Sequence, residues 1–194
     1  MISNRNVIIF AREPRIGTAK TRLANDVGLS EAWKFYRRNL RVIILRLIND
    51  KRWSVYLAVT PDSFHGKEPF LPEGLNIMHQ GRGNIGTRMQ RCLSAISPNP
   101  TLLVGSDIPD ITPKLIWKAF GYLKGHDAVF GPTFDGGYWL VGLKPRILIT
   151  KPFESVDWSS PDTLNETIDA LPRGSNYATT DMLRDIDSGT SYKS

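Results

Sequence analysis

The sequence predicts one α/β domain in which a mostly parallel central sheet carries helices on both faces. Short apolar or β-branched runs, beginning with Val7–Ala11, alternate along the 194 residues with segments of helical periodicity. Strands that alternate with helices favour parallel pairing, because each crossover helix packs on a face of the sheet. We find no internal repeat, low-complexity tract or long linker, so residues 1–194 are expected to form a single domain.

Six runs have the length and composition of strands. They are Val7–Ala11, Ser54–Thr60, Leu75–His79, Thr101–Val104, Ala128–Phe130 and Tyr138–Leu143. Two helices are predicted by apolar side chains that recur on one face. These side chains are Tyr36, Leu40, Ile43, Ile44 and Leu47 in the first helix, and Ile85, Met89, Leu93 and Ile96 in the second.

Three further helix starts follow from capping signals. The dipeptides Thr112-Pro113 and Ser160-Pro161 each place an N-cap residue before a proline. Proline suits the first helical position because the N–H that it lacks would have no partner there. Thr18 is expected to cap a helix that runs from residue 19 to about residue 26.

The net charge of the chain indicates which classes of binding partner are compatible with it. A formal net charge of +6 is compatible with nucleic acid, an anionic membrane surface or phosphorylated small molecules. Beyond the first loop the densest basic cluster, FYRRNLR (35–41), lies within a helical pattern, so we expect a solvated helix face and no nucleic-acid partner. No apolar run suits a signal peptide or a membrane span, and the single cysteine, Cys92, fits a reducing compartment. These features favour a cytoplasmic protein.

Four cations crowd the segment after the first strand, FAREPRIGTAKTRLA (10–24). Ligands bind such sheets at the carboxyl ends of the strands, which is where this segment lies. Gly17 would let a phosphate approach the backbone, and the start of the next helix would favour an anion. The segment lacks the Walker A spacing, and both phosphate binding and an exposed basic turn stay open for it. Its cations are Arg12, Arg15, Lys20 and Arg22.

A carboxylate ends the fourth predicted strand, in LLVGSDIPDIT (102–112). Asp107, directly after Gly105-Ser106, is a candidate ligand of Mg²⁺ or Mn²⁺. Mg²⁺ takes one or two protein carboxylates and completes its coordination with phosphate and water. Asp110 is expected to organise the turn before Thr112.

The segment FGPTFDGGYWLVGL (130–143) places a third group of polar residues at a strand end. Asp135 precedes two glycines whose backbone amides could approach a ligand, and its carboxylate could face a metal or a substrate hydroxyl. A hairpin turn is the alternative, because Asp-Gly is a strong hairpin signal. Tyr138 and Trp139 point to opposite faces of the strand, so only one of them can line a cleft.

The segment HQGRGNIGTRMQRCL (79–93) is a fourth candidate. Glycines 81, 83 and 86 surround polar residues before a helix. Arg88 would lie in the first turn, where a cation opposes the helix dipole, so we expect an anion or a carboxylate to hold it there. Cys92 falls near the apolar face and is predicted to be a core residue.

Five segments together resemble one family, and the resemblance runs from about residue 7 to residue 187. The family comprises the small bacterial GT-A-like proteins described as nucleotide-diphospho-sugar transferase-like, also called radical-SAM/selenodomain-associated or arsenosugar-biosynthesis glycosyltransferases. GSDIPD and DGGYWLVGL are the most specific of the matching parts. The segments are VIIFAREPRIGTAKTRLA, QGRGNIGTRM, GSDIPDIT, DAVFGPTFDGGYWLVGL and VDWSS.

This resemblance implies a Rossmann-like GT-A fold that binds a nucleotide-activated donor through Mg²⁺ or Mn²⁺. It assigns Asp107 to the metal, and we take Lys20 and Asp135 as the candidate catalytic residues. The acceptor-side residues are then Asp135, Gly136, Gly137 and Tyr138. The expected nucleotide-binding residues are Ala11, Arg12, Gly17, Lys20, Arg22, Gly86, Arg88 and Ser106.

The end of the chain departs from the family pattern. Related chains close with an Asp-Val-Asp-Thr-type segment that leads into an acidic helix. Here DIDSGTSYKS keeps Asp185 and Asp187 and then continues in small polar residues. We therefore do not expect a closing helix or a metal contact from Asp187.

Three functions are compatible with these residues. The first is a metal-dependent glycosyltransferase that takes a nucleotide sugar and a small-molecule acceptor; Lys20 would stabilise the departing diphosphate and Asp135 would orient the acceptor hydroxyl. The second is a nucleotidyltransferase, because AKTRLA (19–24) also resembles the loop of the 2-phospholactate guanylyltransferases, which use a nucleoside triphosphate and release pyrophosphate. The third is a nucleotide-binding module without activity. The sequence leaves the oligomeric state open.

Overall fold

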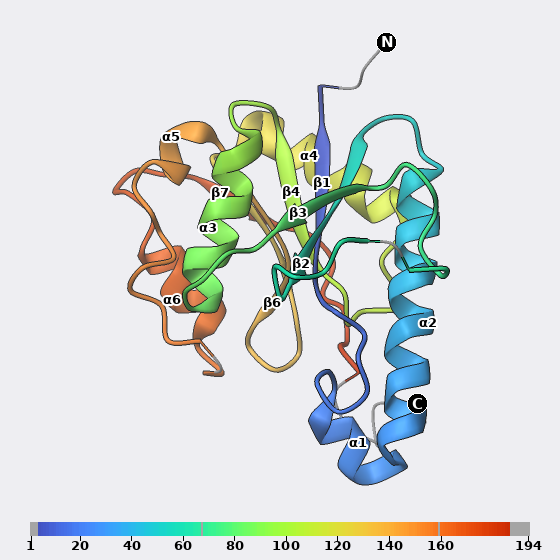
Figure 1. Cartoon of the computed structure of the whole chain (residues 1–194). Coiled ribbons are helices and arrows are strands. Elements are labelled where there is room, and N and C mark those ends of the chain that lie inside the picture. Colours follow the sequence, from blue (N-terminus) through green and yellow to red (C-terminus); the bar gives the residue numbers. More distant parts are fainter. Residues whose placement is uncertain (1–3, 67, 159, 187–194) are drawn as a thin grey trace.

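The computed structural model describes residues 4–66, 68–158 and 160–186. These residues form one seven-stranded sheet in the order β3-β2-β1-β4-β6-β5-β7 (Figure 1). The β6 strand runs antiparallel to β4 and β5, and every other neighbouring pair is parallel, which confirms the mostly parallel sheet. The strands are β1 (Asn6–Arg12), β2 (Ser54–Thr60), β3 (Asn76–His79), β4 (Thr101–Gly105), β5 (Ala128–Pro132), β6 (Tyr138–Leu143) and β7 (Tyr177–Thr179).

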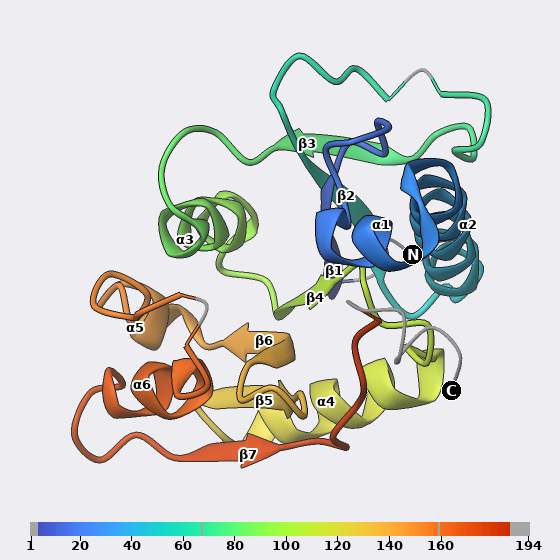
Figure 2. The ribbon, with the colours of Figure 1, turned by 90° about the horizontal axis from the view of Figure 1, so that it is seen from below.

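Helices cover both faces of the sheet (Figure 2). One apolar core lies under α2 and α4, and a second lies under α3, α5 and α6. In β1 the alternation of side chains sends Val7 and Ile9 into the first core and Ile8 into the second, so this strand is buried on both faces. The helices are α1 (Thr21–Val27), α2 (Leu29–Ile48), α3 (Ile85–Ile96), α4 (Pro113–Gly125), α5 (Pro145–Leu148) and α6 (Thr163–Asp169).

The capping signals were correct for only one of the three predicted helix starts. Thr112 accepts a hydrogen bond from the Leu115 N–H at 3.4 Å, and α4 begins at Pro113 as expected. The predicted start at Ser160-Pro161 is wrong, because α6 begins only at Thr163. The Ser160 hydroxyl instead accepts the N–H of residue 162 at 3.1 Å, which closes a turn ahead of the helix.

The predicted Thr18 cap is also wrong. The Thr18 hydroxyl donates to the Arg15 carbonyl at 2.9 Å, so it closes the preceding turn and does not cap α1. The helix begins at Thr21, and Lys20 occupies the cap position with φ 55°, in the left-handed region. This backbone turn directs the chain from the basic loop into α1.

The edge strand β7 has no counterpart among the predicted strands. It spans three residues that are exposed or half-buried, so no apolar run marks it. Its pairing with β5 extends the sheet after the last helix. Within the described ranges, no helix is both long and apolar enough to cross a membrane.

Candidate functional site

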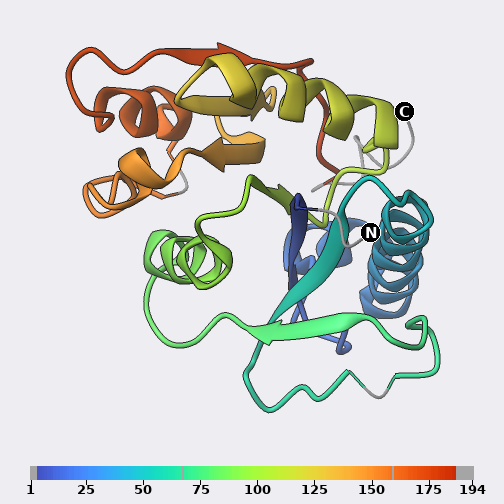
Figure 3. The same cartoon turned by 90° about the horizontal axis from the view of Figure 1, so that it is seen from above.

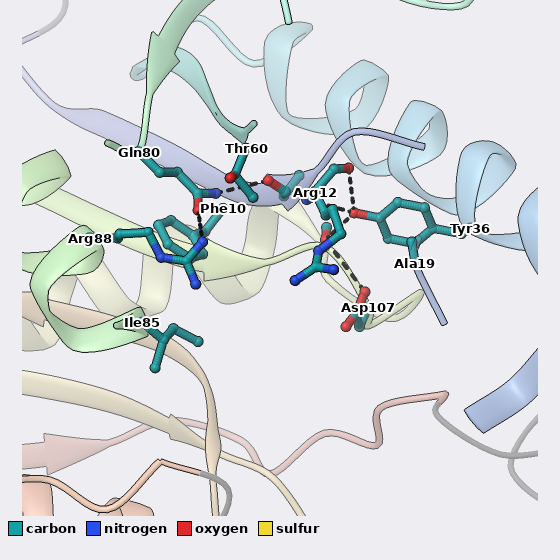
Figure 4. A pocket seen from close by; sticks show the side chains of 11 residues that line it. Phe10, Arg12, Ala19, Tyr36, Thr60, Gln80, Ile85, Arg88 and Asp107 are labelled. Atoms are coloured by element: carbon teal, nitrogen blue, oxygen red, sulfur yellow. Dashed lines mark hydrogen bonds between the residues drawn. The ribbon is translucent and has the colours of Figure 1, made fainter. Parts of the chain in front are cut away.

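A cavity of about 180 Å³ opens at the carboxyl ends of the neighbouring parallel strands β1 and β4 (Figure 4). Strand β1 ends in the basic loop, and β4 ends in the segment that carries Asp107. Helix α3 brings a second arginine to the opposite wall. The lining residues are Phe10, Ala11, Arg12, Ala19, Tyr36, Thr60, Gln80, Ile85, Arg88, Ser106 and Asp107.

An ion pair joins the basic loop to the end of β4. The Lys20 Nζ atom lies 3.1 Å from Asp107 Oδ2. The lysine side chain is only 3% exposed, whereas the aspartate side chain is 44% exposed. Burying an ammonium group is costly unless a counter-charge or hydrogen bonds compensate, so Asp107 holds Lys20 in this position. The carboxylate still faces the cavity.

A tyrosine from α2 anchors the end of β1. The buried Tyr36 hydroxyl donates to the Arg12 carbonyl at 2.9 Å, accepts the Arg12 N–H at 3.0 Å and lies 3.2 Å from Ser106 Oγ. Burial, followed by the charge of Asp107, raises the pKa of Tyr36, so the hydroxyl stays protonated. Asn39, one turn along α2, donates to the Ser106 carbonyl at 2.9 Å. Helix α2 thus holds the ends of β1 and β4 together.

A buried glutamine holds the opposite wall. Gln80 directly follows β3 and is 1% exposed, and its amide group donates to the carbonyls of Ala11 at 2.8 Å and Ala58 at 2.9 Å. Its remaining oxygen accepts a hydrogen bond from Arg88 Nη1 at 3.0 Å. Burial, then the nearby charge of Arg12, lowers the pKa of Arg88. In the described part of the chain Arg88 is therefore held by an amide oxygen and by no carboxylate, and binding of an anion there stays a prediction.

The structure brings four of the eight expected nucleotide-binding residues to the cavity wall, and a fifth, Lys20, joins them through its ion pair with Asp107. Gly17 and Arg22 are exposed and lie outside the cavity lining. A side chain at Gly86 would place its Cβ 2.6 Å from the Phe153 carbonyl oxygen, so this glycine serves the packing of α3 and does not line the cavity. The four lining residues are Ala11, Arg12, Arg88 and Ser106, and the candidate metal ligand Asp107 lines the cavity with them.

The Asp135 segment forms the turn between β5 and β6. One carboxylate oxygen of Asp135 accepts the Thr133 hydroxyl at 2.5 Å and the Gly137 N–H at 3.2 Å, which is the hairpin alternative raised by the sequence. Gly136 adopts φ 87°, and a Cβ there would lie 1.7 Å from the Pro161 carbonyl oxygen. The turn lies at the carboxyl end of β5, but Asp135 does not line the cavity.

Tyr138 and Trp139 both pack inside the protein. The Tyr138 ring lies 5.6 Å from the Phe130 ring and 6.4 Å from the Trp158 ring, and burial raises its pKa. Trp139 is 2% exposed and donates from Nε1 to the Asp181 carbonyl at 3.0 Å. Cys92 is buried in the core as predicted. Tyr138 is thus half-buried against the core that α6 covers, and it does not line the cavity.

Sequence reasoning missed two residues that shape the cavity. Tyr36 was predicted only as part of an apolar helix face, and nothing in a helical pattern shows that its hydroxyl reaches the end of β1. Gln80 stands at the carboxyl end of β3, and its position after a strand was the signal that could have singled it out. Asp187 falls outside the described residues.

The donor set fits a metal that is bound jointly with phosphate. Among the residues that the structure describes, Asp107 is the only carboxylate that lines the cavity, and no three His, Cys, Asp or Glu residues form a metal-binding group. One carboxylate is within the usual number for Mg²⁺, provided that phosphates and water supply the other ligands. The cations around it favour those phosphates.

A family model described as "Uncharacterized protein conserved in bacteria (DUF2064)" matches residues 43–160, more than half of the chain. The chain belongs to this family. The DUF2064 match includes Gln80, Arg88 and Asp107, and it begins after the loop that carries Arg12 and Lys20. No protein of curated function is significantly similar to the chain in sequence.

Solved structures share the fold. A proposed nucleotide-diphospho-sugar transferase from Desulfovibrio desulfuricans G20 has 25% identity and a TM-score of 0.81, over 96% of this chain and 84% of that one. The 4-diphosphocytidyl-2C-methyl-D-erythritol synthase of Anaerococcus prevotii DSM 20548 has 13% identity and a TM-score of 0.60, over 97% and 94% of the two chains. Glucosyl-3-phosphoglycerate synthase from Mycobacterium tuberculosis, in complex with Mn²⁺, UDP and its product, has 11% identity and a TM-score of 0.58, over 97% and 74%.

These similarities confirm the Rossmann-like GT-A fold. The similarity to the Desulfovibrio protein also confirms the expected resemblance to nucleotide-diphospho-sugar transferases, and with it an enzyme. The two more distant structures carry the same fold in a nucleotidyl-transferring synthase and in a sugar-transferring one. The fold therefore does not distinguish transfer of a sugar from transfer of a nucleotidyl group, and this question has to be argued from the residues of the site.

Proposed function

We propose that this chain is a metal-dependent transferase that takes a nucleotide-activated sugar as donor. The observation that carries the proposal is the cavity at the ends of β1 and β4, which brings three cations and one carboxylate together. Arg12 and Arg88 stand on its walls, and Lys20 is paired with Asp107. An excess of positive charge around a single metal-binding carboxylate suits a diphosphate.

The residues would share the work as follows. Arg12 and Arg88 would bind the phosphates, and Lys20 would stabilise the nucleoside diphosphate as negative charge grows on it during departure. Asp107 would hold Mg²⁺ or Mn²⁺, which supplies further charge neutralisation at the leaving diphosphate. Tyr36 and Gln80 position the walls through the hydrogen bonds described above.

Asp135 is our candidate for the acceptor side. Its turn lies at the carboxyl edge of the same sheet, and only one of its two carboxylate oxygens is engaged by the turn among the described residues. The second oxygen would accept a hydrogen bond from an acceptor hydroxyl and so orient it for attack. Asp135→Asn should then lower kcat and leave the binding of the metal–nucleotide complex unchanged.

Nucleotidyl transfer is the second candidate. A nucleoside triphosphate carries more negative charge than a nucleotide sugar, and the convergence of Arg12, Lys20 and Arg88 would suit it. In that reaction Lys20 and Arg88 would hold the departing pyrophosphate. The donor that binds most tightly distinguishes the two reactions.

The first experiment is a panel of nucleotide sugars and nucleoside triphosphates, each with and without Mn²⁺, in which the melting temperature reports binding. Metal-dependent stabilisation by a nucleotide sugar would support glycosyl transfer, and stabilisation only by a triphosphate would support nucleotidyl transfer. Asp107→Asn should abolish the metal-dependent shift. The matched control is Asp110→Asn, because Asp110 is exposed three residues farther on and does not line the cavity. Absence of any shift in the wild type would overturn the proposal.

A further inference from the structure

A second cavity, of about 430 Å³, lies on the outer side of α2. The segment between β2 and β3 curls beside this helix in both Figure 2 and Figure 3, and Arg41 Nε donates to the Phe70 carbonyl at 3.1 Å across the two elements. We call this cavity the α2 groove. It is lined by Trp33, Lys34, Arg37, Arg38, Arg41, Pro69 and Phe70.

Arg37 is held between two aromatic rings. Its guanidinium carbon lies 5.3 Å from the centre of the Trp33 ring and 4.8 Å from the centre of the Phe70 ring. Contacts of this kind engage the flat faces of a guanidinium, whereas its N–H donors lie in its plane. Within residues 4–66, 68–158 and 160–186, the Arg37 side chain makes no hydrogen bond or ion pair. The arginine is therefore fixed in place with its donors unused.

The charge of the α2 groove is unbalanced. Four of its seven lining residues are cations and none is a carboxylate. Lys34 has a nearby counter-charge, because its Nζ lies 3.7 Å from Glu31. The three arginines face no acidic side chain within hydrogen-bonding distance in the described part of the chain. Cations that lie this close together repel each other, and a bound multivalent anion would offset that repulsion.

We propose that the α2 groove binds a small phosphate-bearing anion, at a site separate from the donor cavity. Arg37 would meet the phosphate with two parallel N–H groups, which is the geometry that guanidinium groups favour for phosphate, and Arg38 and Arg41 would flank it. The volume of the groove falls in the range of small-molecule sites. The α2 groove lies between one helix, which carries Trp33, and one loop, which carries Phe70. A site of this limited extent favours a small ligand over a polymer.

The α2 groove shares a helix with the donor cavity. Trp33 Nε1 donates to the Pro14 carbonyl at 2.6 Å, in the loop that follows β1, while Tyr36 on the inner side of α2 bonds Arg12. The three arginines of FYRRNLR, expected from the sequence to form a solvated face, thus all line the α2 groove, whereas Tyr36 of the same segment lines the donor cavity. The proposal does not depend on the reaction at the donor cavity, because it rests on different residues.

Inorganic pyrophosphate is the probe for this site. We would follow the Trp33 indole N–H resonance during a titration at physiological ionic strength, where weak surface attraction is screened. The wild type should show a saturable shift, and Arg37→Gln should weaken binding by about tenfold or more, as expected for loss of a charge-assisted hydrogen bond. Arg88→Gln, in the donor cavity, should leave the Trp33 shift unchanged.

Arg52→Gln is the matched control. Arg52 also lies over two aromatic rings, at 5.0 Å from Trp53 and 4.6 Å from Trp117, but it is paired with Asp50 at 2.6 Å. Its replacement should not change the Trp33 titration. Circular dichroism and melting curves check the fold of each variant. Arg37→Lys keeps the positive charge but loses the paired N–H donors of the guanidinium group, so it should bind pyrophosphate more weakly than the wild type. A shift that never saturates, or that persists in Arg37→Gln, would overturn the proposal.

Discussion

Replacing Lys20 with methionine should raise the affinity of the nucleotide-free protein for Mn²⁺. Lys20 Nζ lies 3.1 Å from Asp107 Oδ2, so the ammonium group occupies the surroundings of the carboxylate that would bind the metal. A divalent ion about 2.1 Å from Oδ2 would stand about 5 Å or less from this ammonium group. The two cations repel each other, and only the phosphates of a nucleotide offset that repulsion.

The magnitude follows from Coulomb's law. A double and a single charge about 5 Å apart repel by ~1.7 kcal/mol even at the dielectric constant of water, which corresponds to about a 15-fold change in affinity. The lysine side chain is 3% exposed, so solvent screens this repulsion less than it screens a pair of fully exposed charges. With nucleotide present the sign reverses, because Lys20→Met also removes a cation that would bind the phosphates.

Isothermal titration calorimetry with Mn²⁺, in the absence and presence of nucleotide, measures both effects. Lys118→Met is the matched control, because Lys118 is paired with Asp181 at 2.8 Å and neither residue lines the cavity. The double variant Lys20→Met/Asp107→Asn should lose the gain in Mn²⁺ affinity. Asparagine tolerates the left-handed backbone at position 20, so Lys20→Asn tests the same loss of charge in a variant that is expected to fold. An unchanged or lower Mn²⁺ affinity in nucleotide-free Lys20→Met would refute the reasoning.

Three further predictions concern stability. A Cβ at Gly136 would lie 1.7 Å from the Pro161 carbonyl oxygen, so Gly136→Ala should lower the free energy of unfolding by more than ~2 kcal/mol in urea titrations, whereas Gly174→Ala, with a similar φ and open space, should cost only ~1 kcal/mol. Tyr36→Phe leaves buried partners without their hydrogen bonds and should cost ~1–3 kcal/mol in the same assay; an unchanged midpoint would contradict this role. Burial raises the pKa of Cys92 from 9.0 to about 11, so between these pH values the folded state binds more protons than the unfolded state and stability falls as pH rises; Cys92→Ala should remove that slope, and parallel pH profiles would argue against it.

The sequence by itself determined the α/β class and the position of the metal candidate. Both depend on local patterns: runs of apolar residues predict buried strands, and a ligand site is expected where a parallel strand ends. Asp107 could be singled out because it directly follows such a strand, and Thr112 because its cap lies within one turn of α4. Signals of this kind act over a few residues, so they can be read without knowing the rest of the fold.

Only the tertiary structure decided what surrounds those residues. Lys20 is buried against a carboxylate 87 positions away, and Tyr36 bonds to the end of β1 across 24 positions. No local pattern encodes such pairs, because they form when strands and helices pack. The same holds for Arg37, whose position between Trp33 and Phe70 depends on a loop from another part of the chain. The sequence shows which residues are charged, whereas packing determines which of these charges are buried, paired or directed into a cavity.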